Sequence, residues 1–342
     1  MSIKVLFLLK QRQGYGVTTS FSSGLFNSAR FASDMLQANG IQTNLIEVVD
    51  GNSIDREVSL YRPSHVIIEA LWVTPEKLQE LARLHPSVRW IVRFHSDPPF
   101  LALESVAVRW LKAYIQIPRV YVAANRLLTT VDFLDIAETS VLPAGKVLLL
   151  PTFYPPGNPQ LKKFLAGKIL SVSCPGAIRP FKNHLNQAIA AMRFAESTHR
   201  VLNFHVNGSR VEQGGGAVLQ NLEALFAGTP HHLIIEPWTE HAGFVDFLRK
   251  MDLGMQVSFT ETFDICAADM VTAGIPMVVS PQVYWASKSA MASPVDVEDI
   301  YGKIVRVVRD KDSSEIFRAS LRGLRDNARM ATDQWLKALR TT

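Results

Sequence analysis

Two carboxylates in the last third of the chain have a spacing that suits two contacts with one ligand. Glu261 and Asp269 stand eight positions apart. We expect a helix to begin just after Glu261 and to carry Asp269 about two turns later. The first carboxylate can then accept hydrogen bonds from sugar hydroxyls, and the second can accept those of a ribose. The structural alternative is an acid that stabilises a helix N-terminus, followed by a solvated aspartate.

The backbone between these two acids predicts an anion site. The first N–H groups of a helix have no partner within the helix and lie at the positive end of its dipole, so they attract phosphate. The residues expected to supply these groups are Thr262, Phe263, Asp264 and Ile265.

Two cations earlier in the chain suit the same anion. Arg179 and Lys182 lie in segment 176–184, which follows a predicted strand. A departing nucleoside diphosphate develops negative charge, and two cations stabilise that charge without a metal. The alternative is a charged loop that caps a helix.

Other chemically versatile residues also follow predicted strands. His95 and Asp97 come after strand 88–94. Here a histidine can bind a sugar or assist an acceptor hydroxyl and an aspartate can act as a polarising base, although a capped strand end is the simpler interpretation. Asn207 follows a later strand and can line a donor pocket, and Trp238 can stack on a nucleobase or belong to the core.

Two glycines after the first strand allow a ligand to approach the backbone. Gly14 and Gly16 do not form a dinucleotide fingerprint, so a dinucleotide is not the expected ligand. No histidine pattern typical of zinc is present, and we interpret Asp310 and Asp312 as the start of a helix. The sequence therefore predicts neither a metal nor another cofactor.

Helices and strands must alternate to position these residues. In the first half the predicted strands are 3–9, 41–49, 65–72, 88–94, 120–124 and 146–150. Segment 151–159 contains four prolines and a glycine, which exclude a helix or a central strand and indicate a linker. The second half repeats the alternation, with strands at 168–173, 201–206, 232–236 and 253–257. This pattern predicts an α/β protein with two doubly wound parallel sheets and a ligand cleft between the domains.

Composition narrows the class of protein. The chain has 342 residues, 47% of them hydrophobic, and suits two domains of ordinary size. No apolar run reaches the length of about 18 residues that a membrane span needs, so we expect no membrane insertion. The segment 3–9 fits a buried strand better than a signal peptide. Cys174 and Cys266 match no redox or metal spacing, which favours a cytoplasmic location.

The positive charge is concentrated at the C-terminus. The net charge is +5, and residues 302–342 hold ten cations and five acids, an excess that equals that of the whole chain. One stripe of a predicted helix over 314–340 consists of Arg318, Arg322, Arg325 and Arg329. A solvated helix face is the simpler interpretation, and contact with a polyanion such as a nucleic acid is the functional one.

The run Ser258–Ser280 and the segment 176–184 resemble retaining GT-B glycosyltransferases of the glycogen-synthase-like, family 4 type. The resemblance implies that a nucleotide sugar, with UDP as the expected nucleotide, binds mainly to the second domain without a metal. It implies that Glu261 holds the sugar hydroxyls, that Arg179 and Lys182 hold the diphosphate, and that Asp269 holds the ribose. It also implies that Gly14 and Gly16 face the donor sugar and phosphate. The family more often has glutamate at the last position, so Asp269 reaches less far.

The same resemblance implies a division of the chain into domains. The expected parts are an acceptor-side domain 1–150, a linker 151–160, a nucleotide-sugar domain 161–312 and a helix 313–342 that packs back on the first domain. The oligomeric state stays open.

Segments 22–29, 54–57 and 65–72 are similar to glycosyltransferases of tailed bacteriophages. This similarity suggests a hydroxylated or hydroxymethylated pyrimidine in phage DNA as the acceptor, in the host cytoplasm. Such a base would have to be flipped out of the duplex. The alternatives are a glycan or lipid-linked acceptor, a GT-B-fold epimerase, and a non-catalytic module that binds nucleotide sugar or DNA.

Overall fold

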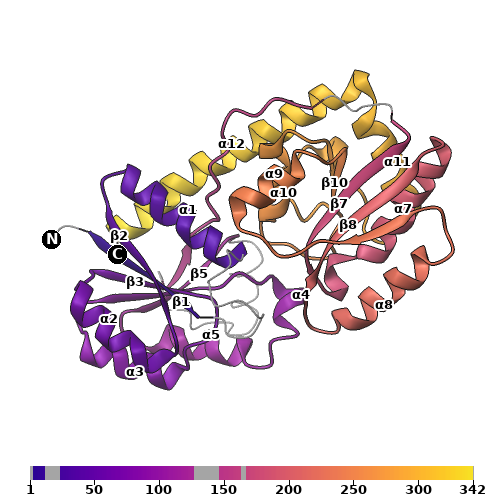
Figure 1. Cartoon of the computed structure of the whole chain (residues 1–342). Coiled ribbons are helices and arrows are strands. Elements are labelled where there is room, and N and C mark those ends of the chain that lie inside the picture. Colours follow the sequence, from indigo (N-terminus) through magenta and orange to yellow (C-terminus); the bar gives the residue numbers. More distant parts are fainter. Residues whose placement is uncertain (1–2, 12–23, 127–145, 163–166, 342) are drawn as a thin grey trace. The chain divides into compact units, whose positions relative to one another are not determined.

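The computed structural model describes residues 3–11, 24–126, 146–162 and 167–341. The chain forms two compact units, each built around one parallel sheet (Figure 1). The first unit contains residues 1–154 and 327–342, and the second contains residues 155–326. One boundary therefore lies in the proline-rich segment, and the other lies within the last helix.

The sheet of the first unit has six strands in the order β2-β1-β3-β4-β5-β6. All of its neighbouring strands pair in parallel. Its strands are β1 (Lys4–Lys10), β2 (Gln42–Val48), β3 (His65–Glu69), β4 (Arg89–Arg93), β5 (Val120–Ala124) and β6 (Val147–Leu149). These are the six strands that the sequence predicts for this half, and the doubly wound α/β fold is confirmed.

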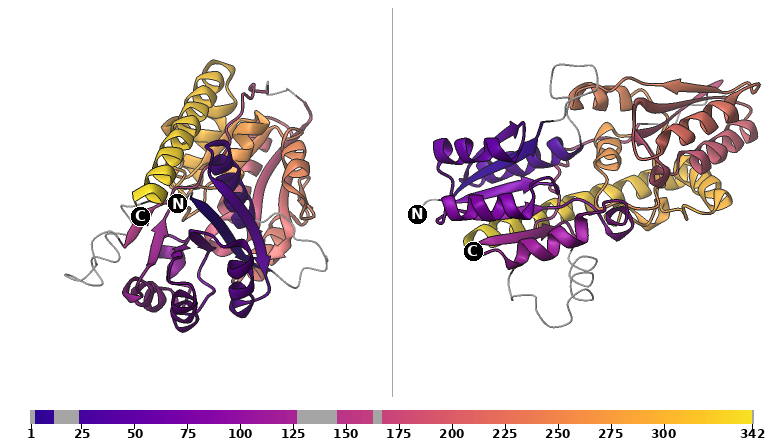
Figure 2. Two further views of the ribbon diagram at one scale, coloured as in Figure 1. Left: turned by 90° about the vertical axis from the view of Figure 1, so that its left-hand side faces the viewer. Right: turned by 90° about the horizontal axis from the view of Figure 1, so that it is seen from below.

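Helices cover both faces of this sheet, as the two further views in Figure 2 show. They are α1 (Gly24–Ala38), α2 (Ile54–Tyr61), α3 (Pro75–Leu84), α4 (Pro98–Leu101) and α5 (Ala107–Gln116), with a 3-10 turn η1 (Gly51–Ser53). Pro75 occupies the first turn of α3, and Thr74 caps it by accepting a hydrogen bond from the Lys77 N–H.

Alternate residues of the strands enter two separate cores. Leu6, Leu8 and Val66 belong to the core that includes residues of α2, α3 and α5. Phe7 and Ile67 belong to the other core, with residues of α1 and the end of the last helix, α12 (Asp310–Thr341). There the Trp335 indole N–H donates to the Pro151 carbonyl over 2.8 Å. Burying one such large side chain contributes about 1.5–3 kcal/mol.

The sheet of the second unit has five strands in the order β11-β10-β7-β8-β9, again all parallel. Its strands are β7 (Ile169–Ile178), β8 (Val201–Val211), β9 (His232–Ile235), β10 (Leu253–Gln256) and β11 (Met277–Val279). The chain adds strands on one side of β7 and then returns to add the others on its opposite side. The order of winding thus reverses between β7 and β10, and ligands of open α/β sheets bind at such a reversal.

The helices of the second unit follow their strands in the expected alternation. They are α7 (His184–Ser197), α8 (Gly215–Phe226), α9 (His241–Leu248), α10 (Ile265–Ala273) and α11 (Val297–Val308), with 3-10 turns η2 (Pro180–Lys182) and η3 (Lys288–Ala290). Gly254 of β10 is needed for close packing, because a Cβ there would lie 2.8 Å from Met270 Cγ of α10. No described helix is long and apolar enough to cross a membrane.

Candidate functional site

The carboxyl ends of β7 and β10 bring one cation and two acids together. The Lys182 ammonium lies 2.7 Å from Glu261 Oε1 and 3.5 Å from Asp264 Oδ2. The contact with Glu261 is an ion pair whose angles fall outside hydrogen-bond geometry. The side chains of Lys182 and Glu261 are 9% and 10% exposed, so this cluster is nearly dry. It lies where the order of winding reverses.

Two neighbours hold the lysine in this position. Lys182 Nζ donates to Gln256 Oε1 over 2.8 Å, and the Gln256 amide in turn donates to the Pro175 carbonyl over 2.6 Å. Gly176 has φ +107, and a Cβ at this position would lie 3.3 Å from Lys182 Cε. Gly176 therefore provides both the backbone conformation and the space that the lysine stem needs.

The charges of the cluster shift each other's pKa. Burial alone would lower the pKa of Lys182, but the carboxylates of Asp264 and Glu261 outweigh it and raise that pKa above its usual value. Burial raises the pKa of Asp264 to about 7, although Lys182 acts in the opposite direction. Lys182 is therefore a permanent cation, whereas Asp264 exchanges its proton near neutral pH.

Helix α10 begins later than the sequence analysis expects. Its first residue is Ile265, and Asp264 is the N-cap, with its side chain accepting a hydrogen bond from the Ala267 N–H over 3.0 Å. Phe263 is buried against Trp285, whose indole N–H donates to the Phe263 carbonyl over 2.8 Å. Thr262 and Phe263 thus precede the helix rather than forming its first turn.

Arg179 lies next to a second carboxylate. Its guanidinium is 3.8 Å from Glu212 Oε2, and Glu212 Oε1 accepts a hydrogen bond from Arg210 Nε over 2.7 Å. The Arg210 guanidinium in turn lies over the Trp238 ring, 4.8 Å from its centroid. Both cations that the sequence analysis assigns to a diphosphate are therefore paired with acids, and Trp238 is next to this chain of charges.

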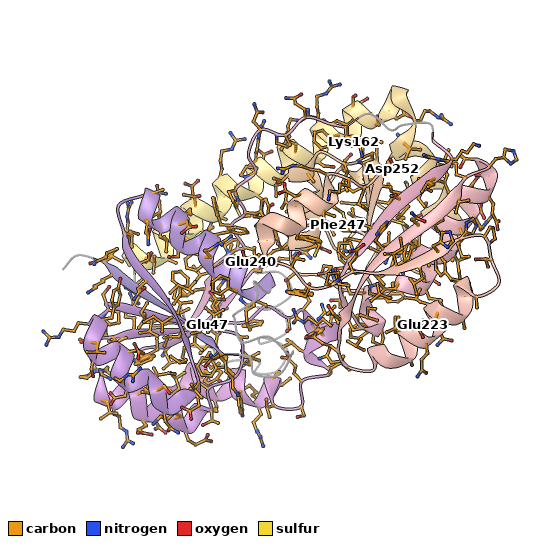
Figure 3. All side chains as sticks on the ribbon, viewed as in Figure 1. Glu47, Lys162, Glu223, Glu240, Phe247 and Asp252 are labelled. Atoms are coloured by element: carbon orange, nitrogen blue, oxygen red, sulfur yellow. The ribbon has the colours of Figure 1, made fainter. Side chains whose placement is uncertain are left out.

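Asp269 lies in α10 and contacts a histidine of α9. The Asp269 side chain is 2% exposed, and its Oδ1 is 2.6 Å from His241 Nε2. His241 is the first residue of α9, and Figure 3 labels the preceding residue Glu240 and, later in the same helix, Phe247. Asn207, within β8, accepts a hydrogen bond from the Gly176 N–H over 2.9 Å and so supports the end of β7, just before the turn that carries Lys182.

The sequence analysis missed Gln256, Glu212 and His241. Each contacts a predicted site residue from a distant part of the chain, and none belongs to a local motif. In the sequence, Gln256 could have been recognised by its polar side chain at the end of an otherwise apolar strand.

The first unit has its own buried polar cluster at the ends of β3 and β4. His95 Nε2 lies 2.5 Å from Glu69 Oε2, and Arg93 Nη1 donates to both oxygens of Glu69 over 3.2 Å. Burial would raise the pKa of Glu69, but Arg93 and His95 outweigh it and lower that pKa. Glu69, which the sequence analysis did not select, therefore remains a carboxylate that fixes the ring of His95.

The remaining predicted residues lie apart from these clusters. Asp97 is at the N-cap position of α4 and 3.9 Å from Arg126 Nη1. On α12 the side chains of Arg318, Arg322 and Arg329 are exposed, whereas Arg325 donates to the Gly157 carbonyl and to Asn158. Gly14 and Gly16 lie outside the described residues. Within the described ranges, no group of three or more histidine, cysteine or acidic side chains could hold a metal ion.

Comparisons with known proteins give structural matches alone. No protein-family model and no curated protein matches the sequence. A solved structure of the E. coli trehalose-6-phosphate enzyme bound with UDP-2-fluoro glucose aligns with a TM-score of 0.67 and 11% identity over 99% of both chains. A UDP-forming trehalose-phosphate synthase from Burkholderia vietnamiensis gives 0.67 and 12% identity over 99% of this chain and 97% of that one.

A third structure extends the match to another source. The N-terminal domain of a Candida albicans trehalose-6-phosphate phosphatase aligns with a TM-score of 0.68 and 11% identity, over 100% of this chain and 97% of that one. At this level of identity the likeness concerns the fold. Together with the two parallel sheets, these matches along the whole chain show that the protein has the GT-B fold.

Proposed function

We propose that this protein is a retaining glycosyltransferase that moves a sugar from a nucleoside diphosphate sugar to an acceptor hydroxyl. The observation that carries the proposal is the buried Lys182 ammonium between Glu261 and Asp264, where the winding of the second sheet reverses. The similar E. coli structure holds UDP-2-fluoro glucose, and another similar trehalose-6-phosphate synthase was studied for glycosyl transfer with retention.

The donor's diphosphate supplies the anion that this site is suited to receive. Lys182 and Arg179 would bind its oxygens, and they would stabilise the negative charge that grows as the sugar–phosphate bond breaks. Gln256 and Gly176 would keep Lys182 in place while the donor binds and the sugar–phosphate bond breaks. Glu261 keeps Lys182 fixed and Glu212 keeps Arg179 fixed before the donor arrives, which reduces the reorganisation that binding requires.

Glu261 and Asp269 take different ends of the donor. Glu261 would accept hydrogen bonds from the sugar hydroxyls, and Asp269 with His241 would bind the ribose hydroxyls. Asn207 and Trp238 would line the nucleotide side of the pocket, with the Trp238 ring available for stacking once Arg210 moves. Thr262, Phe263 and Ile265 would contribute main-chain contacts near the sugar and phosphate.

Transfer with retention requires no protein nucleophile. The bond between the anomeric carbon and the phosphate oxygen breaks, and the acceptor oxygen bonds to the same face of that carbon. The acceptor hydroxyl gives its proton to the departing phosphate oxygen. The protein orients the reactants and stabilises the separated charges, and these contributions account for much of the acceleration in many enzymes.

The first unit would serve the acceptor side of the reaction. Glu69 holds Nε2 of His95, so the ring has a fixed orientation from which it can hydrogen-bond a sugar or acceptor hydroxyl. We assign Asp97 a secondary polarising role in the same step. Gly14 and Gly16 remain part of the proposed donor site on the grounds of the sequence.

A binding experiment with a matched control tests the donor site. Lys182→Ala should abolish binding of UDP-glucose and of UDP in calorimetry, whereas Lys250→Ala should bind like the wild type because Lys250 is an exposed cation of the same unit. A panel of nucleotide sugars would identify the nucleotide. Absence of binding by any nucleotide sugar to the wild type would overturn the proposal and favour a different class of GT-B-fold protein.

For the acceptor we propose a hydroxylated or hydroxymethylated pyrimidine in phage DNA, in keeping with the resemblance of the first half to phage enzymes. The exposed side chains of Arg318, Arg322 and Arg329 on α12 support a polyanionic acceptor. Incubation with a nucleotide sugar and hydroxymethylated DNA should add a hexose or pentose mass to one nucleoside. If sugar appears only on a glycan or a lipid-linked acceptor, the DNA assignment fails and the transferase assignment stands.

A further inference from the structure

The N-cap of α10 is itself an anion. Asp264 Oδ1 accepts the Ala267 N–H, and Asp264 Oδ2 lies 3.5 Å from the Lys182 ammonium. The Asp264 carboxylate thus bridges a helix N-terminus and a lysine, which are two features that bind a phosphate group. We propose that Asp264 occupies the diphosphate position in the ligand-free protein, so that the donor must displace this carboxylate from Lys182 in order to bind.

This inference rests on the proposed function and adds a residue that controls donor affinity. It predicts that binding is an exchange of one anion for another at the same cation. Asp264 would therefore weaken donor binding, whereas Lys182 and Arg179 strengthen it.

The balance of charge in the cluster supports the exchange. Two carboxylates, Glu261 and Asp264, face one ammonium, so above about pH 7, where Asp264 is ionised, the described cluster carries one negative charge in excess. Asp264 Oδ2 is buried and has no hydrogen-bond partner among the described residues. A diphosphate would add two further negative charges next to Asp264, whose one ion pair within the described ranges is the contact with Lys182. Coulomb repulsion at this distance and low exposure is substantial.

The backbone of Asp264 shows that the residue is held there against its own preference. It has φ +65 and ψ 88, in the left-handed region that side-chain-bearing residues rarely adopt. Asparagine adopts this conformation as readily and caps helices as well as aspartate does. The substitution Asp264→Asn therefore removes the charge while it keeps the backbone conformation and the cap.

Protonation neutralises the Asp264 carboxylate and ends its competition with the donor for Lys182. Burial raises the pKa of Asp264 to about 7. Below that pH the neutral acid no longer repels phosphate, and its O–H can donate to a phosphate oxygen, with the proton taken from solvent. Above that pH the ionised acid competes for Lys182. Donor affinity should therefore be high below about pH 7 and should fall as the pH rises through it.

Other groups around Asp264 do not reproduce this behaviour. Lys182 of η2 stays charged, because its pKa is raised by Asp264 and Glu261 in opposition to burial. His184 of α7 stays neutral, because burial lowers its pKa to about 3. Burial raises the pKa of Cys266 in α10, so its thiol stays protonated. The remaining charged neighbours are Glu261, Arg179 and the Asp269–His241 pair, and the Asp264→Asn variant retains all of them.

Calorimetric titration with UDP-glucose at pH 6 and pH 8 tests the proposal. Its diphosphate carries two negative charges at both pH values, so a change in affinity reports on the protein. The wild type should bind about tenfold more weakly at pH 8 than at pH 6, and Asp264→Asn should bind about tenfold more tightly than the wild type at pH 8 with little change between the two pH values. Asp246→Asn, which neutralises an exposed acid of the same unit, should behave like the wild type.

Weaker or unaltered binding by Asp264→Asn, with the pH dependence of the wild type, would overturn the inference and make Asp264 a helix cap alone. Circular dichroism would check the fold, and Asp264→Gly, which also suits a positive φ, serves if the asparagine variant does not fold. Asp264→Glu should keep the weak binding at pH 8.

A second probe separates this inference from the proposed function. If UDP-glucose binds to neither the wild type nor Asp264→Asn, inorganic pyrophosphate is titrated into both proteins at pH 8. Because both titrations use the same pH, the protonation state of pyrophosphate is the same in each and does not affect the comparison. Tighter pyrophosphate binding by Asp264→Asn would then support the anion exchange without the nucleotide-sugar function. Equal or absent pyrophosphate binding would overturn both.

Discussion

The ammonium of Lys182 lies 2.7 Å from the carboxylate of Glu261, although the two residues belong to loops after different strands. This contact joins the residue that we propose binds the diphosphate to the residue that we propose binds the sugar. It also makes the lysine part of the folded structure of the second unit, because two buried acids depend on it.

Replacement of Lys182 should affect stability as well as binding. Lys182→Met leaves Glu261 and Asp264 buried without a cation, which should lower the free energy of unfolding by about 3–5 kcal/mol. The additional change Asp264→Asn should restore part of that loss, because it removes one of the unpaired charges. Urea denaturation of the two variants measures the difference. Equal stabilities would indicate that Asp264 is already protonated in the single variant.

If Asp269 and His241 bind the ribose hydroxyls as we propose, the protein should distinguish UDP from 2′-deoxy-UDP. Asp269→Asn should reduce the affinity for UDP about tenfold, since a hydrogen bond to a charged group is lost, and should affect 2′-deoxy-UDP much less. His241→Gln should shift the same ratio in the same direction. His199→Gln, at an exposed histidine of the same unit, is the control. A uniform loss for both nucleotides would place the ribose elsewhere.

His184 predicts a loss of stability in mild acid. It is fully buried, neither ring nitrogen has a hydrogen-bond partner in the described structure, and burial lowers its pKa from 6.5 to about 3. Between these two pKa values the unfolded chain binds a proton at His184 and the folded protein does not. The contribution of His184 to the free energy of unfolding is therefore fully present above about pH 6.5 and is lost progressively as the pH decreases towards 3.

The size of this effect can be measured against a variant without the group. Between pH 7 and pH 5 the wild type should lose about 2 kcal/mol more than His184→Leu. His232→Gln, at an exposed histidine on β9, should follow the wild type. Parallel pH profiles for the wild type and His184→Leu would show that His184 gains a proton without cost.

Among the cations of the first unit, Arg93 should be the one whose replacement destabilises the protein most. It is fully buried, and it donates to Glu69, to Ser28 and to the Leu150 carbonyl. Arg93→Met should destabilise the protein by about 3–5 kcal/mol, because Glu69 loses its principal partner. Arg83→Met, at an exposed arginine of α3, should change stability by less than about 0.5 kcal/mol. Thermal unfolding of both variants provides the measurement.

Replacement of Glu69 should change the rate of the proposed reaction, because Glu69 orients His95. Glu69→Gln keeps the size of the side chain but removes the charge that faces His95 Nε2. If His95 binds the reacting sugar or acceptor, this variant should lower kcat more than it raises KM for the donor, and it should shift the pH profile of kcat. A variant that is merely less stable would keep the wild-type profile.

The sequence by itself determined the α/β alternation, because buried parallel strands need continuous apolar runs and leave a clear pattern. It also indicated Lys182, Glu261 and Asp269 as a group, since two of them follow strands, the third lies in the next helix, and their residue types suit a phosphorylated sugar. The local start of α10 at Ile265 did not follow from the pattern, because Asp264 adopts a left-handed conformation that an aspartate rarely takes.

Only the tertiary structure decided which charges face one another. Lys182 meets Asp264 and Glu69 meets His95 because the order of the strands brings their carboxyl ends to the same edge of a sheet. Asp269 meets His241 because α10 packs against α9. Burial then shifts the pKa values of these groups, because a low-dielectric surrounding disfavours the charged form and strengthens the effect of neighbouring charges. The sequence contains the residues of the site, and the packing of the strands determines their partners and their protonation.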